Sequence, residues 1–236
     1  LEEGKRYRIG VLKEPLEMPG LAPETDEYFQ LLRERLTADG HTVEEVSFPY
    51  LDYLVPTYYV LTTAEASSNL SRFDGIHYGH RTTEAANLEE LYRKSRSEGF
   101  GPEVKRRIAL GAFVLSAGFY DAYFSKGQQV RRLLQNDTNK LLEQYDFLLS
   151  PTTPGPAFEL GAKTADPIEM YLSDIFTVHA NLTGHPAVTV PLGNAGKSNS
   201  IGVQLLGGFF QEGPLMAFAH HLAEAYRGKH LAAEAV

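Results

Sequence analysis

A strand–helix–strand unit near the start of the chain constrains the fold more than any other feature of the sequence. The stretch RYRIGVLK (6–13) alternates apolar and polar residues as a strand does, and HTVEEVSFP (41–49) is typical of a second strand. Between them, apolar residues recur at helical spacing over residues 25–36, and Asp39-Gly40 is a helix stop signal. This unit predicts an α/β fold.

The rest of the chain adds further strands and helices to this unit. Three more apolar stretches predict strands: YDFLLSP (145–151), HPAVTVPLG (185–193) and SIGVQLLGG (200–208). The segment NLSRFDGIHYGHR (69–81) is rich in turn residues, and TTPGPAFELGAKTADP (152–167) is predicted to be a loop. Apolar periodicity and start signals predict helices at 50–70, 84–98, 102–124, 125–144, 170–184 and 212–227.

The composition excludes several classes of protein. The chain has no Cys, which rules out disulfides, thiol nucleophiles and thiolate metal sites and suits a cytoplasmic protein. The net charge is −8, and no basic run is longer than three residues, so the chain is not expected to hold nucleic acid by itself. It has neither the long apolar run of a membrane span nor an apolar signal segment near residue 1.

A basic triplet, Lys105-Arg106-Arg107, begins an otherwise apolar helix. On a helical wheel Arg106 points away from the apolar stripe, whereas Arg107 lies at its edge, above small residues such as Gly111. The helix carries apolar residues on most faces, so we expect it to be buried nearly all round. Arg107 then needs an anionic partner, either a structural Asp or Glu or the carboxylate of a ligand.

Asp174 is the second charge expected in an apolar setting. It lies in MYLSDIF, and a buried carboxylate there would require a cation or amide partner. Together with Arg107 it could hold a zwitterion, although from the residues alone a structural role is the preferred interpretation of each. The sequence has no GxSxG, HExxH, P-loop or GxGxxG motif. His220 and His221 are expected to be surface or packing residues, and no metal site is predicted.

Several motifs resemble those of the amidase signature family, and the resemblance covers essentially the whole chain. The stretches EASSNLSRFDGIHYGHR (65–81) and SRSEGFGPEVKRRIALGAFVLSAGFYDAYF (95–124) resemble the A subunits of glutamyl-tRNA(Gln)/aspartyl-tRNA(Asn) amidotransferases in particular. YDFLLSPTTPGPAF (145–158), DPIEMYLSDIFTVHANLTGHPAVTVPLG (166–193) and IGVQLLGGFFQE (201–212) match the wider family. The resemblance implies a mixed, twisted sheet flanked by helices on both faces.

The family's Ser-cisSer-Lys triad lies in a Gly/Ser-rich segment that has no counterpart in this sequence. We therefore expect residues 1–236 to be the C-terminal portion of a single amidase domain whose N-terminal catalytic half is absent. By this interpretation the chain contains no catalytic residue and is inactive alone. Strands left without neighbours in such a sheet would expose edges, so self-association is also expected.

The resemblance also implies which residues recognise the substrate. The Arg of the KRRI motif is Arg107, which would bind the α-carboxylate of glutamine, and the Asp of MYLSD is Asp174, which would bind its α-ammonium. The resemblance also implies that one tyrosine of the YY pair lines the glutamine pocket. The spacing favours Tyr58, and Tyr59 is the alternative.

The implied reaction is glutamine hydrolysis, with ammonia passing to a B subunit that holds tRNA, ATP and Mg²⁺, while a small C subunit wraps the two. The chain itself would need no cofactor. Two alternatives are a stand-alone amide hydrolase of the same family and a non-catalytic binding or scaffold module.

Overall fold

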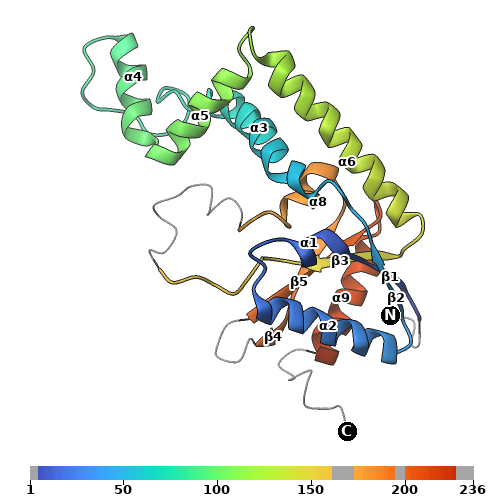
Figure 1. The fold of residues 1–236 in the computed structure, drawn as a ribbon. Helices are drawn as coiled ribbons and strands as arrows, with labels where there is room; N and C mark the ends of the chain where they lie inside the picture. The colour runs from blue at the N-terminus through green and yellow to red at the C-terminus, as the bar shows by residue number, and fades with distance from the viewer. Residues whose placement is uncertain (1–4, 161–172, 195–199, 227–236) are drawn as a thin grey trace. The chain divides into compact units, whose positions relative to one another are not determined.

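The computed structural model describes residues 5–160, 173–194 and 200–226 (Figure 1). The chain divides into two compact units. Unit 1 comprises Leu1–Val55 and Arg131–Val236, and unit 2 comprises Pro56–Val130.

Unit 1 is built on a five-stranded mixed sheet. Its strands are β1 (Arg8–Leu12), β2 (Thr42–Val46), β3 (Phe147–Pro151), β4 (Ala187–Asn194) and β5 (Ser200–Gly207), in the spatial order β2-β1-β3-β5-β4. β1 pairs in parallel with β2 and β3, whereas β5 is antiparallel to β3 and β4. The predicted α/β fold and all five predicted strands are confirmed. The strand–helix–strand unit at the start of the chain forms the parallel pair β1–β2, joined by helix α2 (Pro23–Ala38).

One face of this sheet carries the main hydrophobic core. α2 begins with a proline, whose missing N–H costs nothing at a helix start. It packs Phe29, Leu32 and Leu36, each fully buried, against the same cluster that takes Phe218 and Leu222 of the last helix, α9 (Glu212–Tyr226). Each of these side chains contributes about 1.5–3 kcal/mol by leaving water. The sheet residues in this core are Ile9, Val11, Phe147, Leu149, Val190, Ile201, Val203 and Leu205, and Tyr7 joins them from just before β1.

The opposite face of the sheet is covered by α8 (Val178–Thr183), which Figure 1 shows across the sheet from α2. Gln204 of β5 donates from Nε2 to the carbonyl of Phe176, 3.0 Å away, and so ties the sheet to the turn that precedes α8. The helix predicted over 170–184 is therefore shorter than expected. Residues 170–172 lie outside the described ranges, and Asp174 to Thr177 form a turn.

Two buried histidines lie where α8 meets the second part of α6 (Lys126–Leu142). His179 is 3% exposed, stacks on Phe48 with ring centroids 4.3 Å apart, and places Nε2 2.8 Å from the Thr138 hydroxyl. Because that hydroxyl donates its proton to the Leu134 carbonyl, it accepts from His179, so the imidazole carries its proton on Nε2. Burial, reinforced by nearby His185, lowers the pKa of His179 to about 3.

His185 has a similar environment at the start of β4. It is 5% exposed, places Nε2 3.0 Å from Oδ1 of Asn139, and stacks on Phe209 at 4.1 Å. An amide oxygen only accepts, so Nε2 again carries the proton. The Nδ1 atom of His185 is buried and has no hydrogen-bond partner among the described residues. Burial lowers the pKa of His185 to about 4.

Unit 2 is helical. It contains most of α3 (Leu51–Leu70), α4 (Leu88–Gly99), α5 (Pro102–Val114), a π-helical turn at Asp121–Ser125 and the start of α6. The helices predicted at 50–70, 84–98 and 125–144 are confirmed, as is α9 in unit 1. The single helix predicted over 102–124 is wrong, because α5 ends at Val114. There the Ser116 hydroxyl donates to the Phe113 carbonyl, 2.7 Å away, and offers the backbone an alternative to the helical ladder.

The expectation that this segment is buried nearly all round is also wrong. Only Gly111 and Val114 of α5 are buried, while Leu110, Phe113 and Phe119 are between 40% and 43% exposed. Phe113 packs on Phe119, with centroids 4.2 Å apart, and contacts Tyr123 at 5.6 Å. A helical wheel shows where apolar residues lie, but burial requires a second surface, and in unit 2 α3 covers only the Gly111 face.

Candidate substrate-binding residues

A close contact between α5 and α3 places Arg107. A Cβ atom added to Gly111 would lie 2.0 Å from the backbone oxygen of Thr63 and 2.6 Å from the Cβ of Ser67, so the two helices touch here through their backbones. The small residues beneath Arg107 were predicted to allow close approach by a chain or ligand, and α3 is that chain. One turn earlier on both helices, at helical spacing from this contact, Arg107 meets Tyr59.

This contact leaves no room for a side chain at Gly111. Replacing Gly with Ala inside a helix normally favours helix formation by about 1 kcal/mol. At Gly111 we expect Gly111→Ala instead to lower the free energy of unfolding by about 1–3 kcal/mol, because the methyl group overlaps the Thr63 carbonyl. Urea unfolding measures this.

Gly118→Ala is the control, since an added Cβ there meets nothing within 4 Å. Equal effects of the two substitutions would contradict the close contact.

Arg107 is half-buried between an aromatic ring and a carboxylate. Its guanidinium carbon lies 5.5 Å from the centroid of the Tyr59 ring, and its Nε donates to Oε1 of Glu103 at 3.0 Å. The side chain is 34% exposed. Partial burial alone would lower the pKa of Arg107, but the hydrogen bond and charge of Glu103, together with Tyr59, raise it above its usual value. Arg107 is thus held as a cation in a fixed orientation.

Glu103 is the carboxylate partner that the sequence left unassigned. It pairs with both Arg107 and Arg106, at i+4 and i+3 of the same helix. The interpretation that Arg107 pairs with a structural Asp or Glu is therefore confirmed, and Arg106 is exposed as predicted. The i,i+4 spacing is the signal that could have identified Glu103. Exposed ion pairs are worth about 0–1 kcal/mol, so a ligand carboxylate could displace Glu103 at little cost.

The two candidate tyrosines lie side by side on α3. Their rings meet edge to face, with centroids 5.5 Å apart and planes at 88°. Tyr59 is the one whose ring lies against Arg107. Both residues stay candidates for the pocket, and the structure adds a physical reason to favour Tyr59.

Asp174 belongs to unit 1, and its setting differs from the prediction. Its side chain is exposed, while its neighbours Ile175 and Phe176 are 5% and 2% exposed. The prediction of a buried carboxylate is wrong, because the turn before α8 points the apolar neighbours inward and leaves Asp174 outside. Its carbonyl accepts the N–H groups of Thr177 and Val178, at 3.0 and 3.2 Å, which fixes the backbone that presents the side chain.

His220 and His221 are exposed on α9, so their prediction as surface residues is confirmed. No cluster of three potential metal ligands occurs within the described residues. None of the helices in the described ranges is long and apolar enough to cross a membrane.

Comparison with known proteins places this fold in a family. The Amidase family model matches residues 1–216. The chain belongs to the amidase family. The predicted family is therefore confirmed, and the mixed sheet of unit 1 is part of the amidase fold.

Within the amidase family, the chain is most usefully compared with two curated relatives. The chain is 50% identical over 213 residues to the A subunit of glutamyl-tRNA(Gln) amidotransferase from Saccharophagus degradans, a match that covers 90% of this chain and 44% of that protein. It is also 50% identical over 227 residues to the corresponding protein of Koribacter versatilis, covering 95% and 47%. The chain thus spans less than half the length of these relatives.

Solved structures agree with these relatives. The crystal structure of the A subunit of glutamyl-tRNA(Gln) amidotransferase from Thermotoga maritima matches with a TM-score of 0.70 and 37% identity, over 93% of this chain and 42% of that one. The structure of 6-aminohexanoate cyclic dimer hydrolase matches with a TM-score of 0.73 over 98% of this chain and 48% of that one, but at 21% identity it supports the fold alone.

Proposed function

We propose that this chain is the glutamine-recognising part of the A subunit of a tRNA-dependent amidotransferase. The observation that carries the proposal is the 50% identity to the A subunit of glutamyl-tRNA(Gln) amidotransferase over 90% of the chain. The reaction would use glutamine as the source of ammonia and convert Glu-tRNA(Gln) to Gln-tRNA(Gln), or Asp-tRNA(Asn) to Asn-tRNA(Asn), in the cytoplasm.

In this proposal Arg107 binds the α-carboxylate of glutamine and Asp174 binds its α-ammonium. A guanidinium fork matches a carboxylate in two parallel hydrogen bonds, and Arg107 is already oriented by Glu103 and Tyr59. The exposed carboxylate of Asp174 is available to an ammonium group. Tyr59 or Tyr58 would line the pocket. A pair of opposite charges selects a free amino acid over a peptide or a simple amide.

The bond-breaking groups are proposed to come from outside these 236 residues. A serine activated by the family's Ser-cisSer-Lys arrangement attacks the glutamine side-chain amide, ammonia leaves, and water hydrolyses the glutamyl ester. Backbone donors stabilise the oxyanion. Ammonia then reaches a B subunit, which binds tRNA, ATP and Mg²⁺ and is joined to this chain by a small C subunit. The net charge of −8 suits a chain that leaves tRNA binding to a partner.

A chimera tests this proposal. The N-terminal part of the Saccharophagus degradans relative would be fused to this chain at the boundary of the aligned region and assembled with the B and C subunits of that organism. Glutamine-dependent amidation of Glu-tRNA(Gln) is the expected result. A chimera that hydrolyses other amides but not glutamine would indicate a stand-alone amidase. A folded, assembled chimera without any hydrolysis would indicate a binding or scaffold module.

The chain alone is expected to show no glutaminase activity, because it lacks the Gly/Ser-rich segment that carries the family's nucleophile. Ammonia release from glutamine measures this, with the intact relative as positive control. Turnover that saturates with glutamine and follows this chain through purification would contradict the prediction.

A further inference from the structure

A cavity in unit 2 lies apart from the residues discussed so far. It has a volume of about 280 Å³ and opens between the end of α3, the loop at 71–87 and one side of α4. We propose that this cavity is a second ligand site, for a small aromatic carboxylate. Its walls are the side chains of Leu70, Phe73 and Phe100, with Arg96 and His80 supplying the polar groups that the argument uses.

Arg96 is a fixed cation in the cavity wall. One of its terminal nitrogens donates to the carbonyls of Leu70 and Phe73, at 3.0 and 2.9 Å. Its guanidinium carbon lies 5.1 Å from the centroid of the Phe100 ring. These contacts hold the guanidinium plane without neutralising it, since carbonyl oxygens carry no net charge. The cavity therefore has a permanent positive charge beside two aromatic rings.

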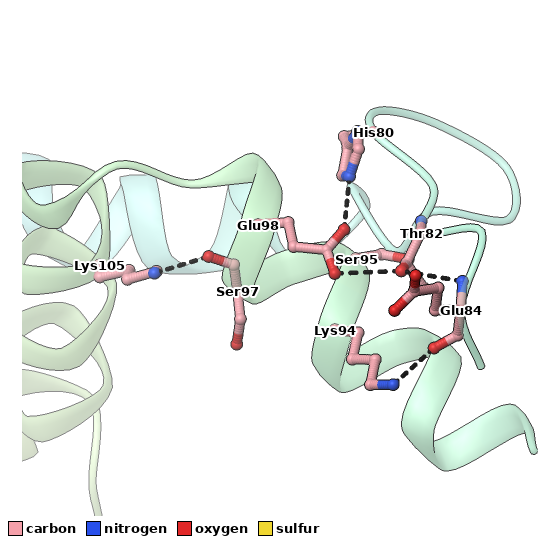
Figure 2. A network of polar contacts seen from close by, with 8 residues as sticks. All are labelled: His80, Thr82, Glu84, Lys94, Ser95, Ser97, Glu98 and Lys105. Carbon is pink, nitrogen blue, oxygen red and sulfur yellow. Dashed lines mark hydrogen bonds and ion pairs between the residues drawn. The ribbon is translucent and has the colours of Figure 1, made fainter. Parts of the chain in front are cut away.

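A polar network fixes the loop that forms the other wall (Figure 2). The Nε2 of His80 lies 2.8 Å from Glu98, and the same carboxylate accepts from the hydroxyl of Thr82 at 3.0 Å. The backbone N–H of Thr82 donates to the hydroxyl of Ser95 at 3.0 Å. Lys94 donates to the carbonyl of Glu84 at 2.6 Å and closes the far end of the loop. The cavity is thus preformed rather than dependent on a mobile loop.

The charge balance selects an anion. Glu98 is engaged by His80 and Thr82, and none of the described residues that line the cavity is acidic. A carboxylate would therefore meet Arg96 without a competing negative charge in the wall. An ammonium group would be repelled by the Arg96 guanidinium.

The size and lining select an aromatic ring. A cavity of about 150 Å³ is enough for benzene, whereas pockets for larger ligands start at about 300 Å³. A volume of about 280 Å³ suits one ring with one short acidic arm. Phe73 and Phe100 offer faces and edges for ring packing, which adds to the burial of apolar area. Glutamine has no ring and is not expected to bind here.

Such a group has two sources: a free aromatic acid, or the C-terminal Phe or Tyr of a polypeptide. The test titrates the isotope-labelled 236-residue chain by NMR with phenylacetate, N-acetylphenylalanine and N-acetylphenylalanine amide. We expect saturable shifts of the amides around the cavity, with a dissociation constant on the order of 1 mM for an acid. The neutral amide should bind at least about tenfold more weakly, because it cannot make the charge-assisted contact with Arg96. Stronger binding of phenylacetate assigns a free acid, and stronger binding of N-acetylphenylalanine assigns a C-terminal residue.

Three variants complete the test. Arg96→Gln removes the charge and keeps an N–H donor for the carbonyls, and it should weaken acid binding about tenfold or more. Arg93→Gln makes the same charge change on the exposed part of the same helix and should leave binding unchanged. Leu70→Trp leaves Arg96 in place and fills the cavity, so it should abolish binding; thermal melts verify that each variant is folded.

The proposal is overturned if no acid gives saturable shifts, if acid and amide bind alike, or if Arg93→Gln weakens binding as much as Arg96→Gln. This outcome is independent of the proposed glutamine function, because none of these residues belongs to the Arg107 site.

Discussion

Replacing Arg107 with alanine in the chimera is expected to lower kcat/KM for glutamine by about 30-fold to 5,000-fold, equivalent to about 2–5 kcal/mol. The substitution removes the cation proposed to bind the α-carboxylate and leaves that group without its partner. It also removes the cation–π contact with Tyr59 and one of the two ion pairs of Glu103, whose pair with Arg106 remains. The glutamine KM should rise, as measured by steady-state ammonia release.

Arg106→Ala is the matched control for this experiment. It removes the same charge one residue away and also breaks an ion pair with Glu103, but from the exposed side of the helix. We expect its kcat/KM to stay within about twofold of the parent, in line with the small worth of surface ion pairs. Arg107→Lys should lie between the two, because it keeps the charge and loses the fork. Equal effects at 106 and 107 would remove Arg107 from the site.

Acidification is expected to destabilise unit 1 well above the range in which carboxylates titrate. Burial lowers the pKa values of His179 and His185 to about 3 and about 4, whereas an unfolded histidine titrates near 6.5. The folded state therefore favours the neutral form of each imidazole, because burial penalises the charged form. Their full contribution is therefore present above about pH 6.5 and is lost as the pH falls from there toward the folded pKa values.

At about pH 5 each buried histidine should lower the free energy of unfolding by about 2 kcal/mol relative to its value at neutral pH. The pair should lower it by about 4 kcal/mol. Urea unfolding as a function of pH measures this loss. His179→Gln keeps an N–H donor for Thr138 but cannot gain a proton, so it should reduce the loss by about half. His220→Gln, at an exposed position, should leave the profile unchanged. A profile that is flat between about pH 7 and pH 5, or one unaffected by His179→Gln, would contradict this account.

The elements that could be predicted from sequence are those whose signals are local. Apolar alternation in RYRIGVLK and helical spacing in residues 25–36 correctly predicted β1 and α2, because both patterns follow from the local geometry of a strand and of a helix. β1 is buried on both faces, whereas α2 buries one face. The segment after Pro102 failed for the opposite reason. Its apolar residues continue through position 124, but α5 ends at Val114, where the Ser116 hydroxyl donates to the Phe113 carbonyl.

The candidate site also has features that the sequence predicted and features that it did not. The wheel correctly placed Arg107 on the Gly111 side and Arg106 away from it, since both follow from the 100° spacing of one helix. Whether the cation would pair with a ligand or with the protein was open, and the structure supplied Glu103. Asp174 was misjudged because the apolar residues around it in sequence turn inward while it turns outward.

The sequence by itself determined the class of fold, the order of the strands and helices along the chain, the amidase family and the residues that resemblance assigns to glutamine. Only the tertiary structure decided that Gly111 is the point where α5 meets α3, that Tyr59 lies against Arg107, and that His179 and His185 are buried and neutral. The reason is physical. Periodicity and capping act between neighbours in the chain, whereas burial, pKa shifts and cavities depend on which distant surfaces meet, and a one-dimensional pattern does not specify those contacts.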